Sequence, residues 1–487
     1  MLVPESNSTS LSTIERLYNE KALMAVIHKA IEQSRISTLP IYVAATLSID
    51  PVDPLALLEQ IQDKKTFRYY WEKPNDSFSM AAGGELERLQ ADGEHRFREA
   101  STNGKELLSR VFHYSEVDHS KTCIHLLGGF SFSEGSKSEL WKAFGTSSFT
   151  LPKWHVLRDG QLSLATATVD ISSLQTVDQI LSALSGQLDA ITFTRGNGEF
   201  VSHSQENPVF QEMNSDESSK NKWLNKIETA VDLIKNGTFK KIVLARKLRI
   251  KASHEISDTC LLNKLREQYP DCHSFLIGFE ESSSFIGATP ERLATFKRNH
   301  IFTEGLAGSI SRGKTASEDA FLEHSLLNSK KDLNEHAFVV DAIEATLTPF
   351  SENIDHPNSP DVKKLSNVQH LYTPMTAHIS ENTSRTEVLK SLHPTPAVGG
   401  FPRDKAVPFI DKLEDFDRGW YAAPIGWINA SGEGEFAVAI RSGLIQKKEA
   451  HFFAGCGIVE HSNPLKEWEE TKLKFIPMLS ALKYATQ

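Results

Sequence analysis

The chain has 487 residues and a formal net charge of −10, with 39% hydrophobic and 24% charged residues, which is typical of a globular protein. The acidic balance argues against a general nucleic-acid or anionic-membrane binder, and no run approaches the roughly 20 apolar residues of a membrane span. The four cysteines form no CxxC pair, and the N-terminus lacks the pattern of a secretory signal, so we expect a cytoplasmic protein.

The first half of the chain alternates helix-like and strand-like patterns. Helix-like stretches cover 21–34, 55–61 and 94–112. Runs rich in apolar, β-branched and aromatic residues predict strands over 39–48, 67–71 and 123–132. A turn at Asp159 and Gly160 predicts a hairpin over 151–169.

Residues 195–220 are rich in Asn, Ser and Glu and predict a loop. This loop would separate an N-terminal portion, about 1–205, from a motif-dense portion, about 221–482. Grouped strands and long helices without a regular βαβ alternation favour the α+β class. We expect one large domain over 1–487, present as a monomer or weak dimer.

The second half carries clearer signals. An amphipathic helix over 223–234 ends at Asn236 and Gly237. Strands are predicted over 240–246, 274–279, 284–287, 302–309 and 436–441. One long helix is predicted over 318–347, and another follows Pro464, a residue that suits a first helical turn.

Lys241 and Glu291 occupy positions that suit acid–base chemistry. Lys241 opens a strand and shares a face with Val243 and Ala245. If that face is interior, desolvation lowers the lysine pKa and makes a general base; the alternative is a solvated strand end. Glu291 follows Pro290 in a turn, where a carboxyl is either an acid or a charge at a helix N-terminus.

Two further positions suit binding of a metal ion or an anion. Glu335 flanks the apolar stripe of the helix over 318–347, where it is either a surface residue or an oxygen ligand of the kind Mg²⁺ takes. Arg441 ends a strand beside small residues, which leaves room for bidentate binding of a carboxylate; the alternative is a salt bridge at the rim. His370 and His393 are equally consistent with core histidines.

The last helix has two distinct faces. Glu467, Glu470 and Lys474 share one face by their i, i+3, i+7 spacing. Either Glu470 and Lys474 form an i,i+4 ion pair, or the carboxylates hold a cation and Lys474 faces an anionic ligand. The apolar residues expected to face the core are Leu465, Trp468, Phe475, Ile476 and Leu479.

Standard motifs for dinucleotide binding, nucleotide hydrolysis, zinc proteolysis and serine hydrolysis are absent from the sequence. Eight blocks nevertheless resemble, in order, the chorismate-utilising enzyme family and its isochorismate synthases. The blocks are KIVLAR (241–246), GATPERL (287–293), GLAGS (305–309), KKDLNEH (330–336), HLYTP (370–374), HPTPAVGG (393–400), IRSGL (440–444) and AGCGIVEHSNPLKEWEET (454–471). The match covers roughly residues 220–480. The N-terminal 200 residues are similar, in length and aromatic strands, to the longer menaquinone-pathway members.

The resemblance implies a fold of two large packed, antiparallel-rich β-sheets flanked by helices, and roles for individual residues. Lys241 matches the base that activates water for attack at C2 of chorismate, and Glu291 matches the acid that protonates the departing C4 hydroxyl. Glu335 and Glu470 match Mg²⁺ ligands, with Glu467 nearby, directly or through water. The implied substrate-binding residues are Gly308, Ser309, His370, Tyr421, Arg441, Gly457 and Lys474.

The resemblance also separates subfamilies. Leu306 replaces the lysine with which aminodeoxychorismate synthases form a covalent adduct, and the HPTPAVGG block differs from those of the ammonia-using members. Asn334 and the Glu304–Gly305 pair depart from the residues of some relatives. We expect an isochorismate synthase of the menaquinone type. The alternatives are a salicylate synthase, which also eliminates pyruvate, and a non-catalytic chorismate-binding protein.

Overall fold

Strand β6 (Ser147–Asp159) is the branch point of the whole sheet. In the computed structural model, which describes residues 12–60, 66–119, 121–135, 138–193, 209–213, 216–280, 283–364 and 368–485, β3 (Phe78–Gln90) pairs along one edge of β6. β5 (His125–Phe130) and β7 (Leu162–Asp170) share the opposite edge, each pairing with a different half of β6. Two limbs of strands therefore start from one place.

The first limb runs from β3 to the strand that carries Lys241. Its strands, in spatial order, are β2 (Arg68–Lys73), β10 (His273–Glu280), β11 (Ser283–Thr289), β20 (Ser442–Gln446), β21 (Glu449–Ile458) and β9 (Lys241–Ala252). The short strands β8 (Phe210–Glu212) and β17 (Gly400–Phe401) lie against β9. Every pairing in this limb is antiparallel.

The second limb leaves from β5. Its strands, in spatial order, are β18 (Pro424–Asn429), β19 (Gly434–Val438), β12 (Arg292–Lys297), β13 (His300–Ser311) and β16 (Val368–Ile379). β14 (Ser351–Asp355) and β15 (Asp361–Lys364) pair with β16. Beyond β7, the strands β1 (Tyr42–Ile49) and β4 (Val111–Ser115) complete the network of 21 strands, with one parallel pairing between them.

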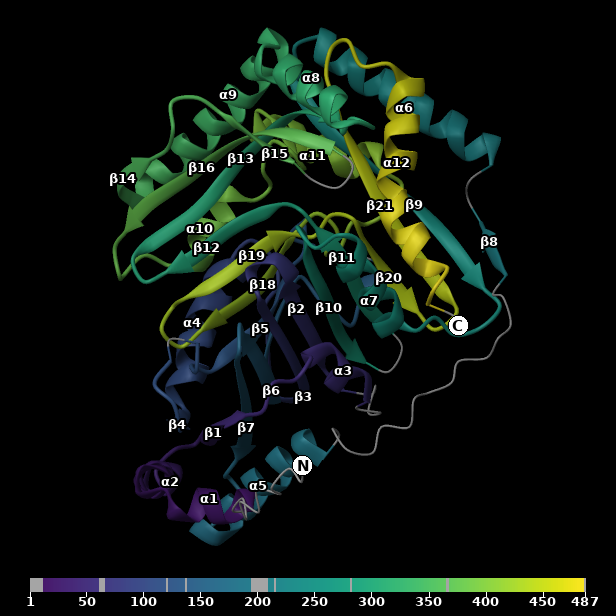
Figure 1. Cartoon of the computed structure of the whole chain (residues 1–487). Coiled ribbons are helices and arrows are strands. Elements are labelled where there is room, and N and C mark those ends of the chain that lie inside the picture. The colour runs from purple at the N-terminus through teal and green to yellow at the C-terminus, as the bar shows by residue number, and fades with distance from the viewer. Residues whose placement is uncertain are drawn as a thin grey trace, which may run out of the picture.

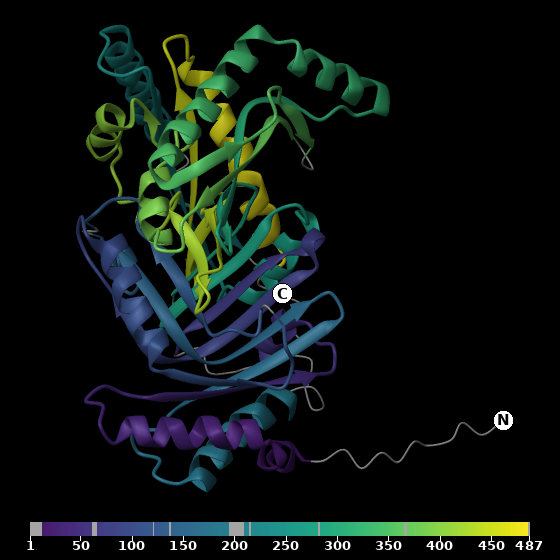
Figure 2. The ribbon, with the colours of Figure 1, turned by 90° about the vertical axis from the view of Figure 1, so that its left-hand side faces the viewer.

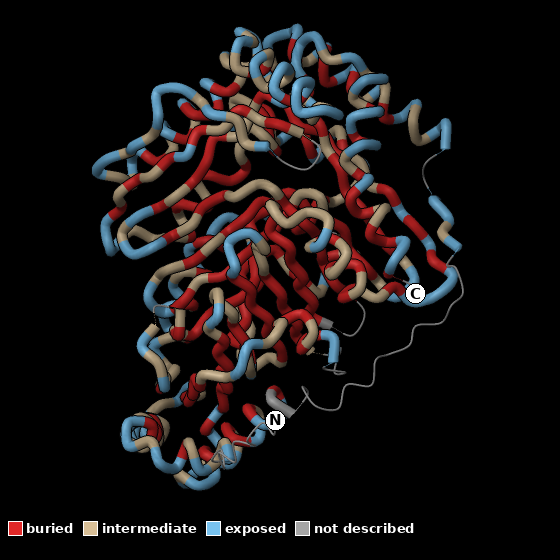
Figure 3. The backbone as a smooth tube through the Cα atoms, in the orientation of Figure 1, coloured by how far each residue is buried: buried red, intermediate tan, exposed pale blue. Residues whose placement is uncertain are grey.

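The α+β class is confirmed, and the two expected sheets are joined by hydrogen bonds at β6. Each limb combines strands from before residue 205 with strands from after residue 221, as in the pairings of β2 with β10 and β5 with β18. The main apolar core lies between the limbs: it includes Phe275 and Phe285 from the first and Phe296 and Phe436 from the second. Figure 3 shows that buried backbone follows the strands and that exposed backbone follows the outer helices and turns.

Helices cover the outer surfaces of both limbs (Figure 1). α1 (Thr13–Asn19), α2 (Lys21–Ser34) and α5 (Val177–Phe193) lie at the end formed by β1, β4 and β7 (Figure 2). α3 (Pro54–Gln60), α6 (Glu217–Lys235), α7 (Asp258–Gln268) and α12 (Pro464–Leu482) pack on the first limb. α8 (Ala316–Leu327), α9 (Lys330–Leu347) and α10 (Arg385–Leu392) pack on the second. α4 (Arg96–Ser109) contacts β3, β6 and α10, and α11 (Arg403–Leu413) contacts β9 and β17. None of the helices among the described residues combines the length and apolar character needed to cross a bilayer.

Most expected elements are present, but the single helix predicted over 318–347 is wrong. The chain forms α8 and α9 because Ser329 caps a new helix, accepting a hydrogen bond from the backbone N–H of Asp332 at 3.3 Å. Most of the loop predicted over 195–220 lies outside the described residues. Within its described part, the chain already forms β8, and α6 begins at Glu217.

Two local predictions near the C-terminus are also wrong. The strand expected over 436–441 ends at Val438, because the Ile440 N–H donates back to the Val438 carbonyl oxygen in a tight turn, and Arg441 then adopts a left-handed conformation with φ +51°. On α12, Trp468 and Phe475 are buried as expected, but Leu465 and Ile476 are about half exposed, at 54% and 49%. The buried stripe instead continues through Met478 and Leu482, because these face α7 and the first limb.

Candidate functional site

A cavity of about 1180 Å³ opens where the far ends of the two limbs come together. β9 and β21 form its wall on the first limb, β13 and β16 on the second, and α9 and α12 contribute side chains from the outside. All the residues proposed from the sequence line it: Lys241, Glu291, Gly308, Ser309, Glu335, His370, Tyr421, Arg441, Gly457, Glu467, Glu470 and Lys474. His393 lies outside this wall, buried with its ring edge-on to Phe132.

Lys241 enters the cavity from the first residue of β9. Its Nζ lies 3.4 Å from Oε1 of Glu335 on α9, and its side chain is 18% exposed. Gly457 on the neighbouring strand β21 provides the space for it: a Cβ at Gly457 would lie 2.9 Å from Lys241 Cε. The lysine therefore occupies a narrow channel beside a strand that has no side chain at this point.

Glu291 lies in the short connection between β11 of the first limb and β12 of the second. Its Oε1 accepts a hydrogen bond from the Thr395 hydroxyl at 3.3 Å. Burial raises the pKa of Glu291 to about 7, with a smaller upward effect from Glu304 that exceeds the opposing influence of the Lys241 charge. A carboxyl with this pKa is substantially protonated at neutral pH and can donate a proton.

Gly308 and Ser309 form a bulge near the end of β13. The pairing with β16 passes from Ala307 directly to Ser309, and Gly308, the extra residue, has φ +73°. The Ser309 hydroxyl lies 2.7 Å from Nδ1 of His370. Burial, together with the nearby cationic side chains, lowers the pKa of His370 to about 4, so its ring is neutral at pH 7.

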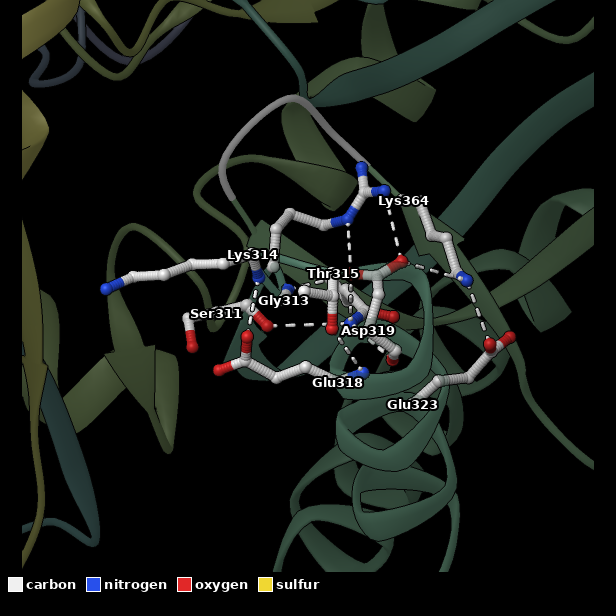
Figure 4. A network of polar contacts seen from close by, with 10 residues as sticks. Ser311, Gly313, Lys314, Thr315, Glu318, Asp319, Glu323 and Lys364 are labelled. Atoms are coloured by element: carbon white, nitrogen blue, oxygen red, sulfur yellow. Dashed lines mark hydrogen bonds and ion pairs between the residues drawn. The ribbon is translucent and has the colours of Figure 1, made fainter.

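Immediately after this bulge, a network of charged groups ties the start of α8 to the sheet (Figure 4). Asp319 accepts hydrogen bonds from Arg312 Nε at 2.7 Å and from the Gly313 N–H at 2.9 Å. Lys364 of β15 bridges Asp319 at 3.3 Å and Glu323 at 2.8 Å. The Arg312 hydrogen bond is the main cause that holds the pKa of Asp319 well below its ordinary value. The network fixes the geometry of the β13–α8 connection.

Glu335 is positioned by the residue that follows it. His336 is buried, and its Nε2 lies 2.8 Å from the Thr373 hydroxyl of β16, while its Nδ1 lies 3.3 Å from the Ala307 carbonyl oxygen of β13. Burial lowers the pKa of His336, so a neutral ring can donate to that carbonyl and accept from Thr373. These two contacts anchor α9 with Glu335 directed toward Lys241.

Arg441 and Tyr421 form the deep end of the cavity. The backbone at Arg441 turns between β19 and β20, and the carbonyl oxygen of Arg441 accepts a hydrogen bond from the Ala288 N–H. Burial lowers the pKa of Arg441, although a guanidinium remains charged at neutral pH. Tyr421 stacks on Phe453 at 5.1 Å between ring centroids, and burial raises its pKa, so the phenol stays protonated as a hydrogen-bond donor.

On the charged face of α12, Glu470 and Lys474 form the i,i+4 ion pair that was one of the two interpretations of their spacing. Lys474 Nζ lies 2.7 Å from Glu470 Oε1, and it also donates to the Gly455 carbonyl oxygen at 2.8 Å. Glu467, one turn earlier, has a raised pKa because of burial, which outweighs its hydrogen bond with Ser462. Lys474 therefore reaches the cavity wall while it remains paired with Glu470.

The carboxylates on α9 and α12 have the chemistry of a magnesium site, since Mg²⁺ prefers a few carboxylates and completes its shell with water or substrate oxygens. Within the described ranges, no three His, Cys, Asp or Glu side chains are grouped as a ligand set. Glu335 and Glu470 are each paired with a lysine instead. The donor types fit Mg²⁺, provided that both carboxylates exchange their lysine partner for the ion.

The cavity is cationic although the chain as a whole is acidic. Among the described residues, its lining includes seven cationic side chains, Lys240, Lys241, Lys331, Arg418, Arg441, Lys466 and Lys474. Five carboxylates oppose them: Glu291, Asp332, Glu335, Glu467 and Glu470. Arg418 is paired with Glu414 behind the wall, but the other six cations still outnumber the five carboxylates. Because Glu291 is also substantially protonated near pH 7, the cavity has an excess of positive charge that suits an anionic ligand.

Several lining residues were not predicted as site residues. Asp332 precedes Glu335 by one helical turn, and that spacing alone could have marked it as a second carboxylate on the same face. Thr395 lies in the HPTPAVGG block and touches Glu291. Arg418, Lys240, Lys331 and Lys466 carry no local pattern that distinguishes them from surface cations.

Comparison with known proteins gives a consistent result. Residues 27–483 match the family model of chorismate binding enzymes. The salicylate biosynthesis isochorismate synthase of Pseudomonas aeruginosa is 38% identical over 466 residues, which cover 95% of this chain and 94% of that protein. Isochorismate synthase MenF of Bacillus subtilis is 34% identical over 482 residues, which cover 97% and 99%.

Solved structures share the fold. The menaquinone-specific isochorismate synthase MenF of Escherichia coli superposes with a TM-score of 0.74 at 22% identity, covering 95% of this chain and all of that one. Anthranilate synthase component I of Streptococcus pneumoniae superposes with a TM-score of 0.68 at 21% identity, covering 82% and 92%. At these identities the similarity supports the common fold.

Proposed function

Since the chain belongs to the chorismate-binding enzymes, whose family model it matches over residues 27–483, we propose that it is an isochorismate synthase. It converts chorismate to its isomer by addition of water at C2 and loss of the C4 hydroxyl, with a shift of the double bond. The observation that carries the proposal is the pairing of two groups in one cationic cavity: Lys241, and Glu291 with its pKa near 7.

The two groups divide the proton transfers. Lys241, held beside Gly457, takes a proton from the attacking water, and Glu291, in its protonated form, gives one to the departing hydroxyl. One proton is taken and one is given, so the reaction needs no oxidant or reductant. Proton donation requires an acid that is still protonated at neutral pH, and the desolvated carboxyl of Glu291 meets that requirement.

Arg441 and Tyr421 are the proposed contacts of the enolpyruvyl carboxylate, one as a guanidinium fork and the other as a phenol donor. Ser309, His370, Lys474 and the backbone at Gly308 and Gly457 complete the proposed substrate wall. Mg²⁺, held by Glu335 and Glu470 with Glu467 directly or through water, would supply positive charge to the ring carboxylate.

The pathway that uses the product is proposed to be menaquinone synthesis, because MenF of Bacillus subtilis is similar over 97% of this chain. A salicylate route is the second candidate, because the Pseudomonas aeruginosa relative carries that name at 38% identity. In that case isochorismate either leaves for another enzyme or loses pyruvate in the same cavity.

Incubation with chorismate and Mg²⁺, followed by chromatographic separation, tests the proposal. A product with the mass of chorismate and a different retention time supports isochorismate synthase. Fluorescent salicylate and pyruvate would replace that assignment with salicylate synthase. Unchanged chorismate, in a sample that still binds it, would leave only the non-catalytic alternative.

A further inference from the structure

We propose that Glu414 and Arg418 form a buried clamp that positions both catalytic side chains. Both residues follow α11, their side chains are only 2% and 3% exposed, and their charged groups meet at 2.6 Å. The inference builds on the proposed function, because it assigns a positioning role for that reaction. Neither residue was identified from the sequence.

The clamp holds the strand that carries Lys241. Arg418 Nη2 donates to the Val243 carbonyl oxygen at 2.9 Å, and Glu414 Oε1 accepts from the Ala245 N–H at 2.7 Å. β21 pairs along one edge of β9, and the short β17 covers only Lys241 and Ile242 on the other. The buried side chains therefore take the place of a strand partner just beyond the proposed base.

The same guanidinium holds the segment that contacts Glu291. Arg418 Nη1 donates to the Val398 carbonyl oxygen at 2.9 Å. The Val398 N–H in turn donates to the Thr395 carbonyl oxygen at 3.1 Å, and the Thr395 hydroxyl donates to Glu291. A continuous series of hydrogen bonds thus connects Arg418 to the proposed acid.

Arg418 is also close to the proposed substrate. It lines the cavity, its backbone carbonyl oxygen accepts from the Tyr421 N–H at 2.9 Å, and its guanidinium lies 4.3 Å from the centroid of the Phe132 ring. The guanidinium therefore fixes two parts of the wall, at Val243 and Val398, and the Arg418 backbone fixes a third, at Tyr421. A guanidinium does this well because its donors lie in a rigid fork.

A role in stability alone explains this arrangement poorly. A buried ion pair generally adds little stability compared with apolar side chains of similar volume. Its specific contribution is to orient the backbone, because Glu414 and Arg418 bind β9 next to Lys241, and Arg418 also binds the segment that contacts Glu291. The relative placement of Lys241 and Glu291 is what such contacts determine.

The test replaces the whole pair, so that no buried charge is left alone. The double variant Arg418→Met/Glu414→Leu is compared with Arg68→Met/Asp258→Leu, which removes another buried pair, with side chains 5% and 7% exposed, that joins β2 to α7 away from the cavity. We expect the kcat of the clamp variant to fall about 10²-fold, with a smaller change in KM, because catalytic groups are displaced. The control should keep its kcat within about twofold. Equal kcat losses in the two variants would overturn the proposal.

A milder substitution covers the case in which the double variant does not fold. Arg418→Lys keeps the charge beside Glu414 but cannot reach both carbonyl oxygens, so kcat should fall while the melting temperature stays close to that of the wild type. Wild-type kcat in this variant would contradict the clamp.

A double-mutant cycle separates positioning from general loosening of the fold. Thr395→Val is combined with Arg418→Lys and, as a control, with Arg68→Lys. If Arg418 acts through Thr395, the first pair is non-additive in kcat and the second is additive. Additivity in both cycles would overturn the proposed path. Wild-type turnover of chorismate is measured first, so a failure of the proposed function is recognised before any variant is compared.

Discussion

Ser309 lies between two regions in which charged side chains are arranged differently: the Asp319 network, where charges are paired, and the cavity, where cations are in excess. At the connection from β13 to α8, Asp319 of α8 is matched by Arg312, and Lys364 of β15 lies between Asp319 and Glu323. In the cavity, cationic side chains outnumber carboxylates, and Lys240, Lys331 and Lys466 have no carboxylate partner among the described residues. Charges that neutralise one another stabilise the local fold, whereas an unmatched excess is available to a ligand.

This comparison explains how an acidic protein can take an anionic substrate. The net charge of −10 is an average over the whole surface, while the substrate responds to the groups within a Debye length, about 8 Å at physiological salt. Substitutions in the cavity should therefore change catalysis, and substitutions in the Asp319 network should change stability.

The largest contrast is expected between two lysines. Lys241→Ala should lower kcat about 10³-fold, because it removes the proposed general base, while chorismate still binds through the remaining cations. Lys364→Ala, in the Asp319 network, is the matched control and should retain wild-type kcat. Turnover by chromatography and binding by calorimetry measure both effects. Near-normal kcat in Lys241→Ala would refute the base assignment.

Glu291→Gln should lower kcat about 10²-fold, because the amide cannot give up a proton to the departing hydroxyl. In the wild type, burial raises the Glu291 pKa to about 7, so the acid is protonated below that pH and kcat/KM should decline as pH rises through it. The variant should lack this alkaline limb. Glu323→Gln is the control, and an unchanged pH profile in Glu291→Gln would assign the titration to another group.

Removal of a proposed metal ligand should have the next largest effect. Glu470→Gln should raise the Mg²⁺ concentration for half-maximal rate about tenfold or more. Glu469→Gln alters the neighbouring carboxylate, which is paired with Lys472 and lies outside the cavity wall, and should leave that concentration unchanged. Glu470→Gln also breaks the ion pair between Glu470 and Lys474, but such a partly exposed pair contributes at most about 1 kcal/mol to the stability of the fold. Identical Mg²⁺ titrations in the two variants would remove Glu470 from the ligand set.

Gly457→Ala tests whether Lys241 needs the space that the missing side chain of Gly457 leaves beside it. The added methyl would lie 2.9 Å from Lys241 Cε, so the lysine must move and kcat should fall about tenfold. Gly186→Ala on α5 meets no atom within 4 Å and serves as the control. A kcat for Gly457→Ala equal to that of the control would show that the lysine has room to adjust.

The sequence was sufficient to bring the twelve proposed residues into one cavity, because each of them lies in a block with a recognisable pattern. Lys241 opens a strand, Glu291 follows a proline turn, and Glu470 shares a helical face with Lys474. The α+β class followed from the grouping of strands and helices. Local pattern and family resemblance therefore predicted which segments meet, although both left the roles of the residues as hypotheses.

The features that were missed depend on contacts between distant segments or on the conformation of one residue. Arg418 gains its significance only from Val243 and Val398, which lie about 175 and 20 positions away in the chain. The break at Ser329 depends on a side-chain cap that competes with continuation of the helix. The strand ends before Arg441 in a tight turn at Val438 and Ile440, and the Arg441 backbone is left-handed, neither of which the alternation of apolar residues reveals.

The smallest effect on catalysis is expected from Asp319→Asn, which weakens the charged network and leaves the cavity lining in place. The Asp319 pKa is held below its ordinary value in the folded chain, mainly by Arg312, so the ionised carboxyl stabilises the fold above the unfolded pKa, and this contribution is lost as pH falls through the folded pKa. The melting temperature of the variant should therefore be lower than that of the wild type near neutral pH, and the difference should narrow in acid. Its kcat should stay within about twofold of the wild type. A large loss of kcat with an unchanged melting temperature would mean that the network controls the bulge at Gly308 and Ser309, and that the two sides of Ser309 act together.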